Sequence, residues 1–255
     1  MTYQPIRKLR HLASAAALGL AAFAPSWAQA MTVQPVVVDL RTAGRDMSQV
    51  ITVENTFSRQ LPVELTVQEL ELTADGVKGT GKDPGDLLIF PPQALIEPGQ
   101  TQTFRVQYVG DPALARSKHY YVTVAQLPVK LPEGQSAIQI LYNFQVLVSV
   151  APSGVKPALK IVAAEVARDK DGKAVPAITL TNNSPAHGYL STGQLRLVAK
   201  DAGGKQVYSH TFSGPDIQQT MGFGLIGGGQ TRRVTVPVVL PDSAASVEAG
   251  FTPDQ

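Results

Sequence analysis

The sequence lacks cysteine, is poor in aromatic residues and contains no long apolar run. Of its 255 residues none is cysteine, 6% are aromatic, and the one tryptophan is Trp27. Without disulfides the fold must be held by an apolar core, which a chain of this length can supply as one or two domains. No stretch after residue 30 clusters lysine or arginine with aromatic side chains, so nucleic-acid binding is not supported.

The first 30 residues have the pattern of a secretory signal peptide. Three basic side chains lie in residues 7–10, residues 12–24 are apolar, and Ala28-Gln29-Ala30 is a small-residue cleavage site. A membrane anchor would need about 20 apolar residues, and the run of residues 12–24 is shorter than that. No second segment is a candidate for a membrane span. We therefore expect cleavage after residue 30 and a mature chain that begins at Met31.

Removal of this leader changes the charge of the chain. The whole sequence has 22 lysine and arginine residues against 20 aspartate and glutamate residues. The leader carries three of the basic residues and no acidic one, so 19 basic residues remain against 20 acidic ones. The mature chain is thus nearly neutral, which gives a nucleic-acid partner no further support.

The longest predicted strand covers residues 137–152 (AIQILYNFQVLVSVAP). Every second residue is apolar, which gives the strand one wholly apolar face. These residues are Ile138, Ile140, Tyr142, Phe144, Val146, Val148 and Val150. At about 3.3 Å per residue the strand would extend roughly 45 Å, more than twice a typical strand. Either it is a central strand buried on both faces, or it outruns its own domain and leaves part of its apolar face for a partner.

Two internal similarities predict a duplicated architecture. Residues 94–106 (ALIEPGQTQTFRV) resemble residues 224–236 (GLIGGGQTRRVTV), and residues 51–55 (ITVEN) resemble residues 178–182 (ITLTN). The copies are 130 and 127 residues apart, which indicates two copies of one domain type. Short strands separated by turn residues, with no predicted helix of three turns, are typical of immunoglobulin-like sandwiches.

The predicted organisation is therefore all-β, with two tandem immunoglobulin-like β-sandwich domains behind the signal peptide of residues 1–30. Residues 151–157 (APSGVKP) contain two prolines and a glycine and are expected to form the linker. The first domain is expected at residues 31–150 and ends with the long strand. The second domain is expected at residues 158–255.

Residues that could carry catalysis are scarce. The histidines after the leader, His119, His187 and His210, are isolated in the sequence and lack metal-ligand spacing. Ser184 precedes His187, but no nucleophile elbow surrounds it and no acidic partner is evident. The sequence therefore predicts no enzyme, no metal site and no cofactor.

Three segments together with the leader resemble a known family. They are LIFPPQALIEPGQTQTFRVQY at residues 88–108, YYVTVAQLP at residues 120–128, and the long apolar strand that ends in Ala151-Pro152. Their order, spacing and text are similar to the periplasmic pilus-assembly chaperones of the chaperone–usher pathway, in a divergent branch. The resemblance covers most of residues 33–152 and is weaker over the second domain.

The resemblance implies a function for the long strand. In that family two immunoglobulin-like domains meet in an L shape, and the last strand of the first domain is donated to a pilus or fimbrial subunit whose own immunoglobulin-like fold is incomplete. The chaperone folds and caps the subunit in the periplasm, without ATP, and delivers it to an outer-membrane usher. On this reading the subunit-binding side chains are Ile138, Ile140, Tyr142 and Phe144, whereas Val146, Val148 and Val150 belong to the chaperone's own core.

The resemblance also implies an anchor for the terminal carboxylate of the subunit. Arg41 is the residue that best matches the arginine of the family, although a solvated turn arginine is the alternative. Leu147 stands where the family has a second basic residue, a lysine. The sequence does not show what replaces this lysine.

Two other functions stay open on the sequence alone. A structural subunit or adhesin of a surface fibre would carry a donor extension at its mature N-terminus and lack a strand, whereas both repeats here look complete. A secreted enzyme or carbohydrate-binding sandwich would need clustered carboxylates or exposed aromatic side chains, and the one tryptophan lies in the leader.

Overall fold

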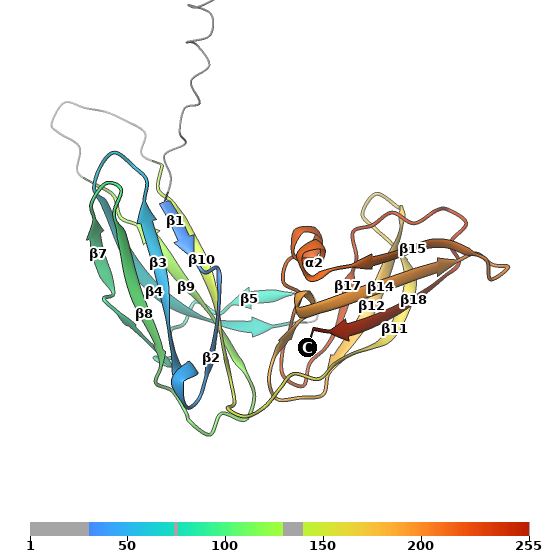
Figure 1. Cartoon of the computed structure of the whole chain (residues 1–255), viewed down its shortest axis with the longest axis horizontal. Coiled ribbons are helices and arrows are strands. Elements are labelled where there is room, and N and C mark those ends of the chain that lie inside the picture. The colour runs from blue at the N-terminus through green and yellow to red at the C-terminus, as the bar shows by residue number, and fades with distance from the viewer. Residues whose placement is uncertain (1–30, 74–75, 130–139, 255) are drawn as a thin grey trace, which may run out of the picture.

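The computed structural model describes residues 31–73, 76–129 and 140–254. These residues form two β-sandwiches that lie side by side with their strands running across each other (Figure 1). The predicted all-β architecture is confirmed. The leader of residues 1–30 lies outside the described residues.

The first sandwich is made of two sheets. One has the strand order β1-β3-β8-β6, and the other has the order β2-β10-β9-β4-β5 with β7 paired to β4. Its strands are β1 (Met31–Gln34), β2 (Val37–Arg41), β3 (Ser48–Asn55), β4 (Leu61–Leu72), β5 (Val77–Gly79), β6 (Leu87–Phe90), β7 (Gln93–Ile96), β8 (Thr101–Tyr108), β9 (Lys118–Gln126) and β10 (Asn143–Ala151). A 3-10 helix, η2 (Arg45–Met47), joins β2 to β3.

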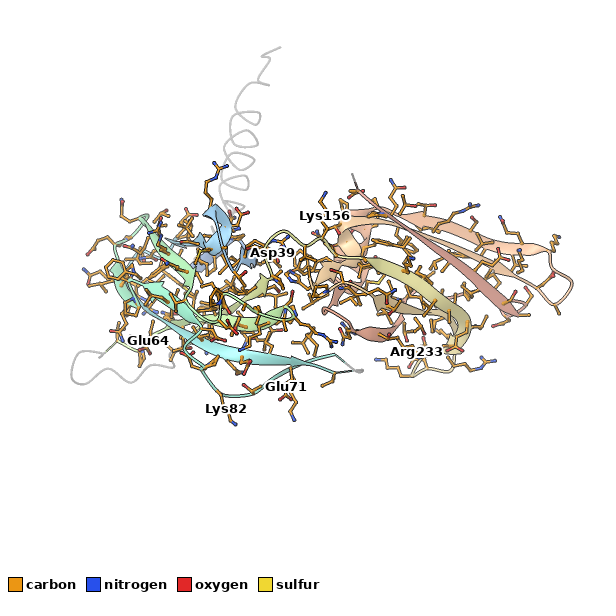
Figure 2. All side chains as sticks on the ribbon, turned by 90° about the horizontal axis from the view of Figure 1, so that it is seen from below. Asp39, Glu64, Glu71, Lys82, Lys156 and Arg233 are labelled. Atoms are coloured by element: carbon orange, nitrogen blue, oxygen red, sulfur yellow. The ribbon has the colours of Figure 1, made fainter. Side chains whose placement is uncertain are left out.

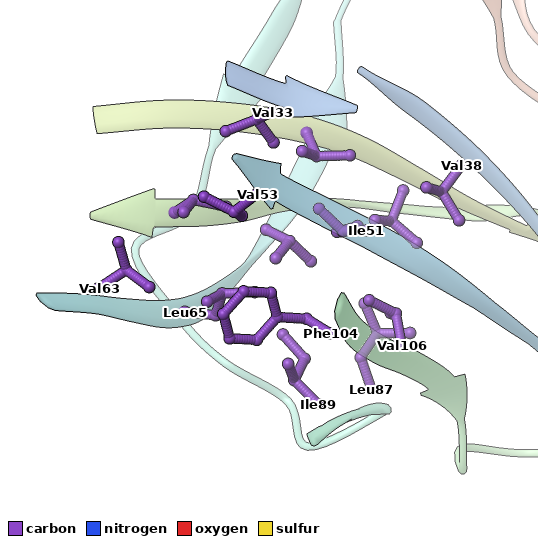
Figure 3. Packing of buried hydrophobic residues seen from close by; sticks show 14 of the residues in the cluster. Val33, Val38, Ile51, Val53, Val63, Leu65, Leu87, Ile89, Phe104 and Val106 are labelled. Carbon is purple, nitrogen blue, oxygen red and sulfur yellow. The ribbon is translucent and has the colours of Figure 1, made fainter. Parts of the chain in front are cut away.

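Alternating side chains of both sheets build the first core. In β8 the buried residues are Phe104, Val106 and Tyr108, and they alternate with more exposed residues. Val38 of β2 and Val63 and Leu65 of β4, in the other sheet, belong to the same cluster, so the core lies between the two sheets (Figure 3). This is the packing expected when strands of period two form a sandwich.

The second sandwich is assembled from three smaller sheets with the strand orders β11-β12-β17, β13-β16 and β15-β14-β18. Its strands are β11 (Leu159–Arg168), β12 (Ala174–Asn182), β13 (Gly188–Tyr189), β14 (Gly193–Lys200), β15 (Gln206–Phe212), β16 (Leu225–Ile226), β17 (Thr231–Thr235) and β18 (Ser246–Pro253). It has its own core, which includes Ile178, Leu180, Leu195 and Leu197.

Helical structure in the second sandwich is short. The 3-10 helix η3 (Leu190–Thr192) precedes β14, and the eight-residue helix α2 (Gly214–Met221) follows β15. Ser213 caps α2 by accepting a hydrogen bond from the Asp216 backbone N–H, and the Asp216 carboxylate accepts one in return. A helix of eight residues agrees with the prediction that no helix reaches three turns.

The internal duplication predicted from the sequence is present as two equivalent asparagine corners. Asn55 ends β3, and its Nδ2 donates to the carbonyls of Arg59 and Ile96, both at 2.8 Å. Asn182 ends β12, and its Nδ2 donates to Ala186 at 2.8 Å and to Ile226 at 3.3 Å. Both asparagines are fully buried.

The turn that follows each corner is also repeated. Gln100 N–H donates to Glu97 O at 3.0 Å, and Gln230 N–H donates to Gly227 O at 3.2 Å. Each turn has a glycine with positive φ at its third position, at 68° for Gly99 and 69° in the second copy. This conformation favours glycine because residues with a side chain rarely adopt a positive φ. The two sandwiches therefore share local structure as well as sequence.

The long strand is shorter than predicted. β10 begins at Asn143, and residues 140–142 are not part of a strand, so the predicted continuous strand over residues 137–152 is wrong for this part. Residues 137–139 lie outside the described residues. The physical reason is that the neighbouring strand β9 ends at Gln126, opposite this point, so the ladder has no partner to continue on.

Candidate functional site

β10 lies between two strands for only half of its length. It pairs antiparallel with β9 from Asn143 to Val150, but parallel with β2 only from Leu147 to Ala151. β2 starts at Val37, because the chain before it crosses over to the other sheet as β1. Among the described residues, the N-terminal half of β10 therefore has a free edge. A free edge is where another strand can add.

Three exposed side chains precede this free edge. Ile140 keeps 65% of its surface exposed, Leu141 44% and Tyr142 37%. Isolated exposed apolar residues are common on proteins, but a contiguous apolar segment beside an open sheet edge is typical of an interaction site. Ile138, the first predicted subunit-binding residue, lies outside the described residues.

Phe144 differs from the other predicted subunit-binding residues. It is half-buried and packs against the first core, beside Val146, Val148 and Val150, which are at most 1% exposed. The prediction that these three valines belong to the home core is confirmed. Because Phe144 already packs on the home core, only part of its surface is left for a partner. The segment that is free to contact a partner therefore ends at Tyr142.

Tyr142 rests on the end of the first sandwich. Its ring centroid lies 6.0 Å from that of Phe57, and its carbonyl accepts a hydrogen bond of 2.9 Å from the Gln126 backbone N–H. The guanidinium of Arg59 lies 5.9 Å from the Phe57 ring centroid on the same surface. These contacts hold the chain where it leaves β10, so that Ile140 stays directed away from the home core.

Arg41 is held by the linker between the sandwiches. It is the last residue of β2 and is half-buried, and its Nη1 donates to Val155 O at 2.9 Å and to Pro152 O at 3.3 Å. The alternative of a solvated turn arginine is therefore wrong. Two carbonyls fix one guanidinium nitrogen, and such a planar group can bind a carboxylate through its other donors.

Leu147 occupies the outward face of the same sheet. It is half-buried, and its register partners are Val37 on β2 and Tyr121 on β9. Two positions further along the same face, Ser149 lies between Asp39 and His119. A lysine at this position would have the same neighbours, so the replacement by leucine makes this part of the sheet less polar.

A partly buried polar cluster joins the two sandwiches close to Arg41, with the Asp39 side chain half exposed and its histidine partner His187 buried. Figure 2 places Asp39 on the side of the first sandwich that faces the second. The Oδ1 atom of Asp39 is 2.8 Å from His187 Nε2, and it accepts a hydrogen bond of 2.7 Å from the Tyr189 hydroxyl. That hydroxyl lies 3.2 Å from Ser149 Oγ, which is 2.9 Å from His119 Nδ1. We call these five residues the junction cluster.

Electrostatics fixes the charge of two members of the junction cluster. Burial works to raise the pKa of Asp39, but the hydrogen bond and charge of His187, with smaller effects of Tyr189 and Arg41, hold it below its usual value. Burial lowers the pKa of His119 to about 3, and the charge of His187 adds to this shift. Asp39 is therefore an anion and His119 a neutral imidazole near neutral pH.

Sequence reasoning missed this cluster. His119 and His187 were expected to be isolated, whereas their ring centroids are 5.3 Å apart in an edge-to-face contact. The acidic partner of His187 is Asp39, which lies 148 residues earlier in the chain. Nothing local in the sequence announces a pair so far apart, and only the docking of one sandwich on the other brings the two residues together.

Ser117 adjoins the junction cluster through His187, but its contacts are structural. Ser117 Oγ lies 3.0 Å from His187 Nδ1, so Ser117, His187 and Asp39 form a hydrogen-bonded chain. Ser117 Oγ also accepts the His187 backbone N–H at 2.8 Å and lies 3.3 Å from Pro185 O. A nucleophile needs its oxygen free toward a substrate. Here the oxygen is engaged by His187 and lies against the carbonyl of Pro185.

Two further searches concern metals and membranes. In the described part of the chain, no group of three or more histidine, aspartate or glutamate side chains is placed to hold a metal ion. None of the helices that the structure describes has the length and apolar character of a membrane span.

Comparison with known proteins identifies the family. Residues 30–156, which include the first sandwich, β10 and the linker contacts of Arg41, match the family model of the pili and flagellar-assembly chaperone, PapD N-terminal domain. The chain belongs to the pilus-assembly chaperones. The resemblance stated from the sequence is thereby confirmed. No curated protein sequence matches the chain.

Solved structures similar to this chaperone share its fold over nearly the whole chain. The class 5 fimbriae chaperone CfaA is 11% identical, with a TM-score of 0.52 over 89% of this chain and 100% of its own. A second similar structure is the CsuC–CsuE chaperone–tip adhesion subunit pre-assembly complex from the archaic chaperone-usher Csu pili of Acinetobacter baumannii. It is 13% identical, with a TM-score of 0.51 over 87% of this chain and 97% of its own.

A chaperone–tip adhesin complex of CFA/I fimbriae biogenesis is 13% identical, with a TM-score of 0.50 over 82% of this chain and 86% of its own. At identities this low the similarity establishes the fold alone. That fold is two tandem immunoglobulin-like sandwiches, as the sequence predicts.

Proposed function

We propose that this chaperone binds pilus subunits through the exposed segment that precedes β10. The observation that carries the proposal is the free edge of β10 with Ile140, Leu141 and Tyr142 exposed beside it. A subunit whose immunoglobulin-like fold lacks a strand has an open groove and an unpaired sheet edge. Strand addition at β10 satisfies its backbone hydrogen bonds, and alternate side chains fill its groove.

The donated apolar surface comes mainly from Ile138, Ile140 and Tyr142. At about 1.5–3 kcal/mol for each fully buried side chain, the three contribute roughly 5–9 kcal/mol before the costs of ordering and association. Phe144 adds less, because it is already packed on the home core. No nucleotide hydrolysis is required, since the favourable step is the folding of the subunit on the donated strand. We assign no catalytic role to any residue.

Arg41 is the proposed anchor for the terminal carboxylate of the subunit. The carbonyls of Pro152 and Val155 orient its guanidinium, so less entropy is lost when a carboxylate binds. Charge-assisted hydrogen bonds to a carboxylate are roughly twice as strong as neutral ones. The apolar Leu147 leaves Arg41 without the second basic residue that the family pattern would provide.

The location and domain limits belong to the same proposal. Residues 1–30 act as a cleaved signal peptide and bring the chain to the periplasm, where residues 31–150 form the subunit-binding domain. Residues 151–157 link it to the second domain of residues 158–255, and the loaded chaperone delivers its subunit to an outer-membrane usher. Separate buried cores on either side of the linker support these limits. An intact mass that retains residues 1–30 after export would contradict the location.

Single substitutions distinguish donated from home positions. Ile140→Asp should leave the free protein folded, since this side chain is 65% exposed, and abolish capture of a co-expressed subunit by placing an unpaired charge in an apolar groove. Leu141→Asp is the matched control. This neighbour is also exposed but points to the opposite face of an added strand, so capture should persist. Val148→Asp should prevent folding, because this side chain is fully buried.

Periplasmic yield, thermal unfolding and co-purified subunit are the measurements. If Ile140→Asp destabilises the free protein as much as Val148→Asp, the segment is ordinary core and strand donation is wrong. If Ile140→Asp and Leu141→Asp both retain the subunit, the binding surface lies elsewhere.

A further inference from the structure

The second sandwich is attached to both edges of one sheet of the first. That sheet has the strand order β2-β10-β9-β4-β5, so Asp39 on β2 and Leu72 at the end of β4 are separated by three strand spacings, roughly 14 Å. At the β2 edge Asp39 bonds to His187. At the other edge the β4–β5 hairpin reaches the second sandwich (Figure 1), and Gln230 Nε2 donates to Thr73 O at 3.2 Å.

The hairpin meets the duplicated turn of the second sandwich, residues 227–230, which we call the glycine turn. Its sequence is GGGQ, whereas the equivalent turn of the first sandwich, residues 97–100, is EPGQ. All four residues of the first copy are exposed, but Gly227 is buried. Of the three glycines in the glycine turn, Gly229 alone has a positive φ. The conformation of the turn therefore accounts for Gly229 and not for Gly227 or Gly228.

Gly227 leaves room for a side chain of the first sandwich. A Cβ atom on Gly227 would lie 2.6 Å from Leu72 Cδ1, closer than Cβ atoms approach other atoms in proteins. The Gly227 backbone N–H donates to Gln230 Oε1 at 2.8 Å, and the Nε2 of the same amide donates to Thr73 O. One side chain therefore closes the glycine turn and also binds the hairpin that packs against it.

The other two glycines also lie beside groups at the interface. A Cβ atom on Gly228 would collide with the carbonyl of Pro185, and this carbonyl accepts the Ser117 backbone N–H of the first sandwich at 3.0 Å. A Cβ atom on Gly229 would lie 3.0 Å from Cζ of Arg116, which also belongs to the first sandwich. Side chains missing from the glycine turn thus leave the space in which the two sandwiches meet.

We propose that the glycine turn is the docking site of the β4–β5 hairpin, and that this contact fixes the angle between the two sandwiches. Attachment at the β2 edge alone would let the second sandwich rotate about that edge, because polar interfaces between domains usually permit relative motion. A second attachment roughly 14 Å away, at the opposite edge, prevents this rotation. The proposal concerns the free protein and does not depend on subunit binding.

Spin labels on two introduced cysteines can measure this angle. The chain has no cysteine of its own, so Glu54→Cys on β3 and Thr235→Cys on β17, both exposed and one in each sandwich, give a single labelled pair. Double electron–electron resonance then gives the distribution of distances between the labels. With no further substitution the distribution should be a single narrow peak. The same background carries each variant below.

Two substitutions of matched size test the contact from its two sides. Gly227→Val inserts a side chain where Leu72 packs, so the narrow peak should be lost. Leu72→Ala empties the same contact and should also broaden the distribution, which covers the case that Gly227→Val does not fold. The double variant removes from Leu72 as many carbon atoms as it adds at Gly227, so it should restore the narrow peak.

The matched control is Gly250→Val. It makes the same change in the second sandwich at an exposed glycine whose Cβ would have no atom within 4 Å, so the narrow peak should remain. Four results would each overturn the proposal: a broad distribution without these substitutions, a narrow peak in both single variants, a double variant as broad as Gly227→Val, or an equal broadening by Gly250→Val.

Discussion

Replacing His119 with a residue that cannot titrate should flatten the dependence of stability on pH. His119 is 3% exposed, and its Nδ1 lies 2.9 Å from Ser149 Oγ, whereas its Nε2 is buried without a partner among the described residues. A charged imidazole is unfavourable there, and burial lowers its pKa from 6.5 to about 3. His119→Asn keeps an amide that can bond to Ser149 and removes the titration.

The sign and size follow from proton linkage. The pKa is depressed in the folded state, so below about pH 6.5 the unfolded chain binds a proton that the folded chain does not. The stability contributed by neutral His119 is complete above about pH 6.5 and is lost as the pH falls toward the folded pKa. The loss is about 1.4 kcal/mol per pH unit, or about 2 kcal/mol between pH 7 and pH 5.

Urea unfolding followed by circular dichroism at about pH 7, 6 and 5 measures this loss, because linear extrapolation gives the free energy of unfolding at each pH. Tryptophan fluorescence is not available, since the one tryptophan lies in the leader. The wild type should lose about 2 kcal/mol more than His119→Asn over this range. The exposed His210→Asn is the control and should follow the wild type. If the wild type and His119→Asn lose stability in parallel, His119 is not held neutral by the fold.

Other substitutions test the anchor and the two cores. Arg41→Ala should abolish subunit recovery from the periplasm and lower the free energy of unfolding by about 1 kcal/mol, the net value of a hydrogen bond; unchanged recovery would remove Arg41 from the site. Asn182→Ala should lower the free energy of unfolding measured in urea by about 2–4 kcal/mol, because buried carbonyls of the second sandwich lose their donor. Asn55→Ala should do the same in the first sandwich. A loss below about 1 kcal/mol would contradict the stabilising role of the asparagine hydrogen bonds. Tyr120→Phe should cost about 1.5–3 kcal/mol, since the buried Tyr120 hydroxyl donates to the Asp86 carboxylate at 2.7 Å, and an unchanged urea midpoint would show that this bond contributes nothing.

Repetition and periodicity made much of the fold predictable. The spacing placed Val146, Val148 and Val150 on one apolar face, because side chains alternate between the faces of a strand, and the family resemblance assigned these three residues to the home core. The repeated asparagines were equally visible, because each corner uses short-range hydrogen bonds that demand the same residue types in both copies. Family resemblance then added the role of the strand, which periodicity leaves undecided between a buried core strand and a donated one.

The end of β10 could not be placed from the sequence. The apolar alternation continues through Ile140, but a strand exists only where a neighbour supplies hydrogen bonds, and β9 ends at Gln126, one residue beyond the partner of Asn143. For Phe144 the pattern gives the face of the strand, whereas only the structure shows that the side chain is partly buried against the home core. Its contact with a subunit stays a prediction.

The sequence by itself determined the strands, the apolar face of β10 and the two-domain plan, since each depends on residues near one another in the chain. Tertiary structure alone decided the junction cluster and the bonds of Arg41. Asp39 meets His187 across 148 residues, and Arg41 meets Val155 across 114. Such contacts form only when one domain docks on another, and no local propensity encodes which polar side chains then find themselves within 3 Å of each other.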